Sequence, residues 1–407
     1  MNNKLNIFLK SIKVVLLVSF LISANDIKVE AKEHVLTGLD ILKKNNFSDL
    51  NNKRVGLITN HTAFDQDGNY ILDIFSKQNK FKLNAIFTPE HGLRGKEDRE
   101  FIPSETYQKD IPVYSLYNEI KKPTSKMLDN IDVLVYDIQD IGTRYYTFIT
   151  TLAYCMEAAR EKGIDFVVLD RPNPIGGSII EGEVLKPKFK SFTGYLNIPT
   201  RYGMTVGEIA NYYNSESHLN VNLKVIKMEN WQRDMFYNQT GLKWINPSPN
   251  MRSVEAATVY PGLGMLETVN LSVGRGTSNP FIYYGAPWLD NYSLVKELNK
   301  KRFDGLKFEA IKFTPDNSTF TKVKLNGFKV IINDKTKVRS VDALIYALYY
   351  INKQNKGKLK YDGMNRSFGS SLLTEMLDGK YTPTQVLEKL KKDQNKFLSI
   401  RKKYLLY

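Results

Sequence analysis

The sequence predicts an α/β protein whose first domain holds a mostly parallel sheet and whose second domain is smaller and α+β. Between residues 53 and 228, short apolar runs alternate with helical segments through short connections, which is typical of a parallel sheet covered on both faces. A proline-rich loop at residues 246–250 ends this alternation. With 407 residues the chain is long enough for two domains, which we place at residues 36–250 and 253–407.

The first 31 residues have the features of a secretory signal peptide. Lys4, Lys10 and Lys13 precede an apolar run at residues 14–22, and a small-x-small stretch ends at Ala31. The apolar run is shorter than the roughly 20 residues that a membrane-spanning helix needs. We therefore expect a secreted protein, extracellular or associated with the cell wall; the alternative is an uncleaved membrane anchor.

Four strands of the predicted sheet end in polar residues. These strands are expected at residues 54–59, 83–87, 131–136 and 165–169. The carboxyl ends of parallel strands lie along one edge of a sheet, where α/β proteins bind ligands. We therefore expect one polar cluster formed by Asn60, His61, Glu90, His91, Asp137, Gln139, Asp140, Asp170, Arg171 and Asn173.

Further elements connect and flank these strands. A strand at residues 111–116 contains Pro112, which places it toward an edge of the sheet, and another strand is expected at 223–228. Thr205 and Glu208 have the spacing of a capping box at the start of a helix. The expected helices of this domain span residues 69–78, 147–162 (closed by Gly163) and 204–215.

The second domain has a different sequence pattern, without the regular alternation of strands and helices. The glycine-containing stretch at residues 260–277 is expected to be a recognition loop rather than part of a core. Apolar alternation predicts a strand within residues 320–332, and helical spacing predicts helices at 341–351 and 383–402.

Composition and missing motifs argue against several classes of protein. The formal net charge of +15 favours anionic wall polymers or lipids as partners, but the lysines are dispersed and no nucleic-acid-binding motif is present. No G-x-G-x-x-G follows the first strand and no G-x-x-x-x-G-K-[ST] occurs, so we expect neither nucleic acid nor a nucleotide as a ligand. The single cysteine, Cys155, forms no internal disulfide.

Carboxylates at strand ends, without a cysteine–histidine cluster or a G-x-S-x-G motif, favour acid–base chemistry such as glycoside hydrolysis. That reaction needs a protonated acid at the leaving oxygen and a second group that assists attack on the sugar carbon. Glu90 suits the acid because the apolar strand end beside it favours a protonated carboxyl group, and His91 can orient it. An alternative is a metal site made by His61, His91, Asp137 and Asp140. No H-x-H or H-E-x-x-H spacing is present, so we expect no metal.

Five long motifs together resemble those of one bacterial family. They are F-T-P-E-H-G at residues 87–92, Y-D-I-Q-D-I-G-T-R-Y-Y-T at 136–147, L-D-R-P-N-P at 169–174, N-P-S-P-N-M at 246–251 and N-L-S-V-G-R-G-T at 270–277. The family is that of the NamZ-type exo-β-N-acetylmuramidases, formerly a domain of unknown function. The resemblance implies a Rossmann-like domain, a smaller C-terminal domain and an active site in the cleft between them. It also implies an exo-acting hexosaminidase that removes N-acetylmuramic acid from the non-reducing ends of peptidoglycan fragments, for cell-wall turnover and without a cofactor.

The resemblance also implies roles for single residues. Glu90 matches the acid of the P-E-H-G motif and is the expected general acid, while Glu267 precedes Thr268-Val269-Asn270 where a Gly-Thr-Asn-like run is expected. We place Glu90, His91, Asp137 and Asp140 in the catalytic set. The expected substrate-binding residues are Asn60, His61, Gln139, Arg144, Tyr145, Asp170, Arg171, Asn173, Arg201, Asn250, Glu267, Asn270 and Arg275. The second catalytic group is left open, because the 2-acetamido group of the substrate can itself act as nucleophile.

Muramic acid differs from glucosamine by a lactyl ether that carries a carboxylate, and a bidentate arginine is the expected reader of that group. Arg144, Arg201 and Arg275 are the candidates, and each can instead be an ion-pair residue. The expected partners are muropeptides or disaccharides derived from peptidoglycan, with wall association by charge. Two other functions stay open: a non-catalytic wall-sugar-binding protein, and a metal-dependent hydrolase such as a deacetylase.

Overall fold

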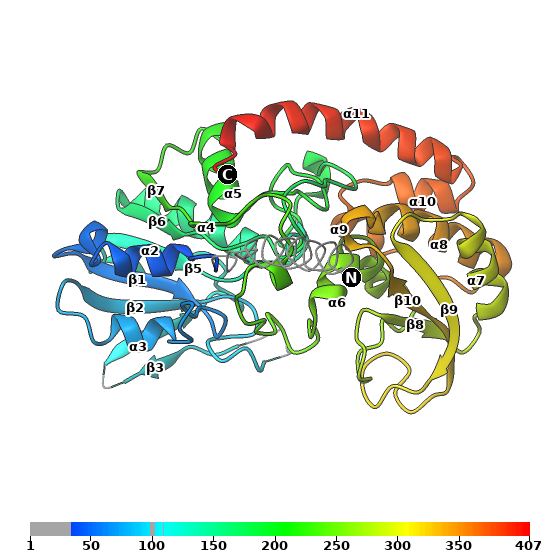
Figure 1. Cartoon of the computed structure of the whole chain (residues 1–407), viewed down its shortest axis with the longest axis horizontal. Coiled ribbons are helices and arrows are strands. Elements are labelled where there is room, and N and C mark those ends of the chain that lie inside the picture. Colours follow the sequence, from blue (N-terminus) through cyan, green and yellow to red (C-terminus); the bar gives the residue numbers. More distant parts are fainter. Residues whose placement is uncertain (1–33, 98–101, 109) are drawn as a thin grey trace, which may run out of the picture. The chain divides into compact units, whose positions relative to one another are not determined.

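The computed structural model describes residues 34–97, 102–108 and 110–407, which are drawn in colour in Figure 1. The expected signal peptide at residues 1–31 lies outside the described residues. Residues 34–407 form one compact unit. A search of the described helices finds none that is both long and apolar enough to cross a membrane.

The predicted fold class is confirmed. In the described part of the chain, seven strands form a sheet in the order β3-β4-β2-β1-β5-β6-β7, and three form a second sheet in the order β8-β10-β9 (Figure 1). The large sheet is parallel except for the edge strand β3, and the small sheet is antiparallel. The strands are β1 (Arg54–Thr59), β2 (Lys82–Thr88), β3 (Glu105–Tyr107), β4 (Ile111–Ser115), β5 (Val133–Asp137), β6 (Asp165–Leu169), β7 (Leu223–Ile226), β8 (Tyr283–Ala286), β9 (Leu306–Phe313) and β10 (Leu325–Ile332).

Helices cover both faces of the large sheet and pack beside the small one. They are α2 (Gly38–Lys44), α3 (Ile71–Phe75), α4 (Phe148–Lys162), α5 (Val206–Glu216), α6 (Val254–Leu263), α7 (Asn291–Lys300), α8 (Ser340–Gln354), α9 (Met364–Phe368), α10 (Leu372–Leu377) and α11 (Pro383–Arg401). The capping box of α5 is present as predicted, with Thr205 accepting from Glu208. Gly163 closes α4 in a left-handed conformation that glycine adopts at little cost.

The central strand β5 shows why the sheet is buried on both faces. Val133 and Val135 point to one face and pack into a core with α2 and α3, whereas Leu134 and Tyr136 point to the other face and pack with α4 and α5. A continuous apolar run, rather than an alternating one, is what a strand covered on both sides requires. The second of these cores continues into α6, α8 and β10, so both halves of the chain share it.

Some predicted elements differ from the structure. The stretch 260–277 was expected to be a loop outside the core, but its first part forms the end of α6 and a 3₁₀ helix at Gly264–Thr268. Tyr260, Leu263 and Leu266 are buried there because three apolar side chains at helical spacing pack into the shared core. The α3 helix is shorter than predicted, and β4 lies one strand in from the edge because the unpredicted β3 pairs with it.

The expected convergence of strand ends is confirmed at the level of topology. β2, β1, β5 and β6 are neighbours and parallel, so their carboxyl ends lie along one edge of the sheet. The order of strands also reverses direction between β1 and β5, and such a reversal is where open α/β sheets leave a crevice for ligands.

Candidate active site

The turn after β2 positions Glu90 and His91. Pro89 follows the strand and cannot continue its hydrogen-bond ladder, because proline has no N–H group. The backbone then enters the left-handed region, with φ values of 70° at His91 and 66° at Gly92. Both Glu90 and His91 line a cavity of about 180 Å³.

Hydrogen bonds hold both side chains in place. Thr147 Oγ1 donates to Glu90 Oε2 over 2.6 Å, and because Thr147 is the residue directly before α4, the carboxyl group lies at the positive end of that helix. His91 Nδ1 lies 2.6 Å from the carbonyl oxygen of Glu97. A carbonyl oxygen only accepts, so Nδ1 carries the proton, and the Nε2 of a neutral ring faces Glu90 Oε1 at 4.0 Å as an acceptor.

The cavity is closed by side chains from both halves of the chain. The side chain of Glu90 is 24% exposed, so a ligand in the cavity can reach it. Aromatic rings form much of the wall, and polar groups are interspersed among them. The other lining residues are Tyr117, Tyr145, Tyr146, Thr147, Thr193, Ser248, Tyr260, Gly264, Met265, Glu267, Thr268, Arg275, Phe281 and Ser367.

Glu267 and Arg275 contribute the charges from the C-terminal half. Arg275 Nη2 lies 2.6 Å from Glu267 Oε1, and both side chains remain partly exposed. The guanidinium carbon of Arg275 is 5.5 Å from the ring centroid of Phe281, within the range of a cation–π contact. The cavity therefore holds a second carboxylate and one arginine that could meet an anionic substituent.

Three tyrosines of the wall act as neutral groups. Tyr145 donates its hydroxyl hydrogen to the carbonyl oxygen of Tyr260, and their ring centroids are 5.1 Å apart. Burial raises the pKa of Tyr145, Tyr146 and Tyr260 above its usual range, so all three keep their protons at neutral pH. They provide a flat apolar wall and hydrogen-bond donors rather than a base.

Asp137 and Arg171 form a buried ion pair away from the cavity wall. Arg171 Nη2 donates to Asp137 Oδ2 over 3.0 Å and to the carbonyl oxygen of Phe64 over 3.0 Å, while Nε donates to Asp137 Oδ1. Burial raises the pKa of Asp137, and the charge of Arg171 acts in the opposite direction. Both side chains are almost fully buried, which gives them a role in joining strand ends.

Asp140 and Gln139 are also internal. Asp140 Oδ2 accepts from the Gly142 N–H over 2.7 Å and from the hydroxyl of Tyr202. Burial raises the pKa of Asp140 to about 6. Gln139 Nε2 donates to two carbonyl oxygens, those of Asp140 and Pro172, each over 2.8 Å.

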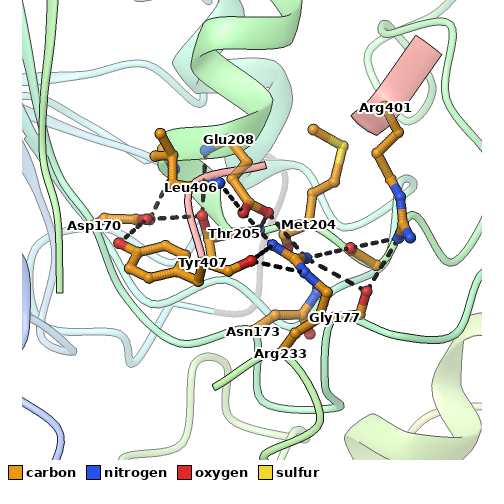
Figure 2. Close-up of polar contacts among 12 residues, drawn as sticks. Asp170, Asn173, Gly177, Met204, Thr205, Glu208, Arg233, Arg401, Leu406 and Tyr407 are labelled. Atoms are coloured by element: carbon orange, nitrogen blue, oxygen red, sulfur yellow. Dashed lines mark hydrogen bonds and ion pairs between the residues drawn. The ribbon is translucent and has the colours of Figure 1, made fainter. Parts of the chain in front are cut away.

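Asp170 and Asn173 belong to a polar network under α5, drawn in Figure 2. Asp170 accepts from Thr205 Oγ1 and from the hydroxyl of Tyr407, each over 2.7 Å (Figure 2). It also accepts from the Gly207 N–H over 2.8 Å. Burial raises the pKa of Asp170 to about 7. Asn173 Nδ2 donates to the carbonyl oxygen of Met204 over 2.8 Å.

Arg144 and Arg201 are fully buried and hold the chain together. Arg144 donates through both terminal nitrogens to four carbonyl oxygens, two of which belong to Ser367 and Phe368. Burial lowers the pKa of Arg144 to about 10. Arg201 Nη1 pairs with Glu181 Oε2 over 3.0 Å and also donates to the carbonyl oxygen of Val338, while Nη2 donates to that of Ile175. Of the three candidate arginines, Arg275 is the one that lines the cavity.

Three predicted asparagines and His61 also lie off the cavity wall. Asn60 is buried and accepts from Thr62, and Asn250 is buried. His61 Nε2 lies 2.8 Å from the carbonyl oxygen of Asn246, and burial lowers the pKa of His61. Asn270 bridges backbone groups of Lys358 and Lys360, over 2.9 and 2.7 Å.

The structure thus brings together five of the predicted site residues and adds others. The five are Glu90, His91, Tyr145, Glu267 and Arg275. Tyr146 and Thr147 were missed although they end the Y-D-I-Q-D motif run, whereas Thr193 and Ser367 carry no signal in the sequence. Among the described residues, no three histidine, cysteine, aspartate or glutamate side chains gather as metal ligands.

Comparisons with known proteins provide evidence that is independent of the geometry of the cavity. Residues 55–255 match the family model described as exo-β-N-acetylmuramidase NamZ, N-terminal, and residues 258–407 match its C-terminal counterpart. The peptidoglycan β-N-acetylmuramidase NamZ of Bacillus subtilis (strain 168) is 39% identical over 384 residues, covering 92% of both chains.

Two solved structures of DUF1343 family proteins from Bacteroides fragilis NCTC 9343 are also similar. Their TM-scores are 0.87 and 0.75, at 37% and 29% identity, and each covers 92% of this chain and 99% of its own.

Proposed function

Because the chain belongs to the NamZ family of exo-β-N-acetylmuramidases, we propose that it releases N-acetylmuramic acid from the non-reducing ends of peptidoglycan fragments. The Bacillus subtilis relative is a peptidoglycan β-N-acetylmuramidase, and the similarity extends over 92% of this chain. The observation that carries the proposal is the placement of Glu90, which faces a small cavity walled by aromatic rings.

The size of the cavity supports exo action. At about 180 Å³ it is smaller than the roughly 300–1,000 Å³ of pockets that take drug-sized ligands. Such a space suits one terminal sugar rather than an internal segment of a glycan. The flat faces of Tyr145 and Tyr260 offer apolar area to a sugar ring, and Thr147 and Ser248 offer hydroxyl groups.

In this proposal Glu90 donates a proton to the glycosidic oxygen. The bond between the sugar carbon and that oxygen breaks as water or the 2-acetamido oxygen of the substrate bonds to the carbon, the leaving sugar keeps the proton, and Glu90 becomes a carboxylate. The hydroxyl of Thr147 and the positive end of α4 stabilise the carboxylate that forms. His91, held by Glu97, presents a hydrogen-bond acceptor beside it.

Glu267 is our proposal for the second catalytic group. Asp137 and Asp140 were placed in the catalytic set from the sequence, but both are engaged inside the protein and neither lines the cavity. Glu267 lines the cavity with Glu90 and is partly exposed. It can activate water or orient the 2-acetamido group of the substrate, and both are known uses of a second carboxylate in glycosidases.

Arg275 is our proposal for the reader of the lactyl carboxylate. Its planar guanidinium group suits bidentate recognition of a carboxylate, and its side chain is 25% exposed toward the cavity. An incoming lactyl group would share Arg275 with Glu267.

We further propose that the protein is secreted and takes part in wall turnover. The support for this is the basic and apolar pattern of residues 1–31 together with the substrate of the family. Mass spectrometry of the protein recovered from culture medium should show an N-terminus near residue 32, and recovery of the uncut chain in the membrane fraction would contradict it.

The function is tested with two disaccharides that contain the same sugars. The purified protein should release N-acetylmuramic acid from a disaccharide with that sugar at the non-reducing end, and should leave the reversed disaccharide intact. Full activity after exhaustive chelation is expected. Binding of the first disaccharide without any product would favour a wall-sugar-binding protein and would contradict the proposal.

A further inference from the structure

A second cavity, of about 630 Å³, shares a wall with the candidate active site. It is lined by Lys188, Phe189, Lys190, Ser191, Asp362, Gly363, Asn365 and Arg366. Residues 187–189 form a short 3₁₀ helix, and the other side of the cavity comes from the start of α9. Neither segment carries a predicted site residue.

Two chain segments separate this cavity from the active site. The first contributes Ser191 to the second cavity and Thr193 to the active site, and the other contributes Arg366 and Ser367 in the same way. The segments touch, because a Cβ atom on Gly194 would lie 3.3 Å from the carbonyl oxygen of Arg366. Ser191 Oγ and Thr193 Oγ1 lie 3.3 Å apart, although the two residues line different cavities. One extended ligand can therefore reach from one cavity into the other.

The second cavity is basic. Lys188, Lys190 and Arg366 line it against one carboxylate, Asp362, and all three cations are exposed. Within the described ranges none of these three makes an ion pair with an acidic side chain. Lys186 beside them differs, because it pairs with Glu183 and Asp393. The charges of these three side chains are thus not neutralised by acidic partners within the described part of the chain.

Aromatic rings connect the two cavities. The ring of Tyr117, in the active-site wall, lies 5.8 Å from the ring of Phe192, and Lys121 Nζ lies 4.5 Å from the centroid of Phe192. On the far side, Lys190 Nζ is 3.7 Å from the ring centroid of Tyr195, and Lys188 Nζ is 4.9 Å from that of Phe189. The segment 188–195, which contributes to both cavities, therefore carries aromatic rings with lysines placed over them.

We propose that the second cavity binds the leaving side of the glycan and recognises the lactyl carboxylate of its next N-acetylmuramic acid. This proposal rests on the proposed function. Peptidoglycan alternates two sugars, so in a glycan strand freed of its peptides a terminal muramic acid in the active site is followed by a neutral glucosamine and then by a second free lactyl carboxylate. A neutral ring suits the aromatic stretch, and the carboxylate suits the lysines and Arg366. The enzyme then prefers longer glycans to disaccharides.

Three substrates with N-acetylmuramic acid at the non-reducing end test this preference. They are the disaccharide, the natural tetrasaccharide, and a tetrasaccharide whose internal muramic acid is replaced by N-acetylglucosamine. For the unaltered protein, kcat/KM for the natural tetrasaccharide should exceed that for either of the others by roughly fivefold, the scale of one to two partly exposed ion pairs. High salt should reduce the preference.

The variant Lys188→Gln/Lys190→Gln/Arg366→Gln should lose this preference and keep the disaccharide rate. The matched control is Lys301→Gln/Lys389→Gln, which removes two lysines that also lie over tyrosine rings, 4.3 and 4.6 Å from the centroids, but outside both cavities. Equal turnover of all three substrates by the unaltered protein, or a preference that survives in the triple variant, would overturn the proposal and leave the proposed function standing. No cleavage of any of the three substrates would overturn both.

Discussion

Glu90 and Arg275 face the same cavity with different tasks. Glu90 is held by Thr147 at the start of α4, and the geometry favours a group that gains and loses charge during the reaction. Arg275 keeps its charge throughout and is placed beside a second carboxylate and an aromatic ring. We therefore expect changes at Glu90 to affect the chemical step and changes at Arg275 to affect the choice of sugar.

The variant Arg275→Gln should lose discrimination between muramic acid and glucosamine. A hydrogen bond to a charged group contributes about 1.5–3 kcal/mol, so KM for aryl N-acetylmuramic acid glycosides should rise roughly 10- to 100-fold. Turnover of the corresponding N-acetylglucosamine glycoside, if measurable, should not fall. Arg302→Gln, an exposed arginine outside the cavity, is the control. An unchanged ratio between the two sugars would contradict the role of Arg275.

For single residues, the sequence identified motifs that contribute to the cavity, but it could not show which residues of a motif face the cavity and which are buried for structural reasons. Glu90 and Asp137 both end apolar strands, yet one faces a cavity and the other pairs with Arg171. Arg144 donates to carbonyl oxygens 39 to 224 residues away, and nothing local indicates those partners. A buried polar side chain needs hydrogen-bond partners within the protein, just as a ligand-binding side chain needs its ligand. Structural sites and ligand-binding sites therefore contain the same types of residue, and the sequence does not separate them.

Among the elements, α11 is tied to the large sheet by the segment that follows it. Tyr407 donates its hydroxyl hydrogen to Asp170 Oδ2, and Arg233 donates to the Tyr407 carbonyl oxygen over 3.1 Å (Figure 2). The Tyr407 hydroxyl also accepts from the Met228 N–H over 2.8 Å. Arg401, at the end of α11, donates to the carbonyl oxygens of Gly177 and Gly203 (Figure 2).

The variant Tyr407→Phe should show a stability loss that depends on pH. Burial raises the pKa of Asp170 to about 7, above its value in the unfolded chain, so the unfolded state loses its proton first and stability falls as pH rises from about 4 to 7. The Tyr407 hydroxyl stabilises the ionised form. Its loss should cost about 1–2 kcal/mol at pH 8 and less at pH 5.

Urea unfolding at pH 5 and pH 8 measures this difference, with Tyr292→Phe as the control because that side chain is 70% exposed. An equal loss at both pH values would contradict this expectation, because it would show that the Tyr407 hydroxyl acts independently of the charge on Asp170.

The strands and helices that the sequence predicted correctly are those whose buried side chains form a simple pattern along the chain. β1, β5 and β6 are covered on both faces, so their continuous apolar runs were recognised. β9 was not predicted, although Leu306 and Phe308 are buried and alternate with exposed charges in the pattern of a half-buried strand. α6 was missed because its sequence ends in Pro261 and Gly262, which usually indicate a turn, and tertiary packing overrides that preference.

At the scale of the whole molecule, the active site exists only when both halves of the chain are folded. The cavity takes Glu90 and Thr147 from one half and Glu267 and Arg275 from the other. One hydrophobic core contains residues of both α4 and α8, so it does not divide the chain into two parts near residue 250. The domain boundary predicted there stays a prediction.

We expect the protein to unfold in a single cooperative transition. Arg144 and Arg201 donate to the carbonyl oxygens of Phe368 and Val338, which joins the two halves through buried hydrogen bonds in addition to the shared core. Calorimetry and loss of activity should therefore report the same midpoint. Two resolved heat-absorption peaks, with activity lost in the first, would contradict this expectation.

The central claim is that Glu90 protonates the leaving oxygen, and leaving-group dependence tests it most directly. The variant Glu90→Gln keeps the size of the side chain and removes the proton donor. Its kcat/KM should be compared with that of the unaltered protein and of the exposed control Glu309→Gln, on aryl N-acetylmuramic acid glycosides whose phenols differ in acidity.

Acidic phenols leave without much protonation, so the variant should retain most activity on them and lose roughly 10²–10⁴-fold on poor leaving groups and on the disaccharide. The same fractional loss for every leaving group, or no loss, would contradict the assignment of Glu90 as the general acid.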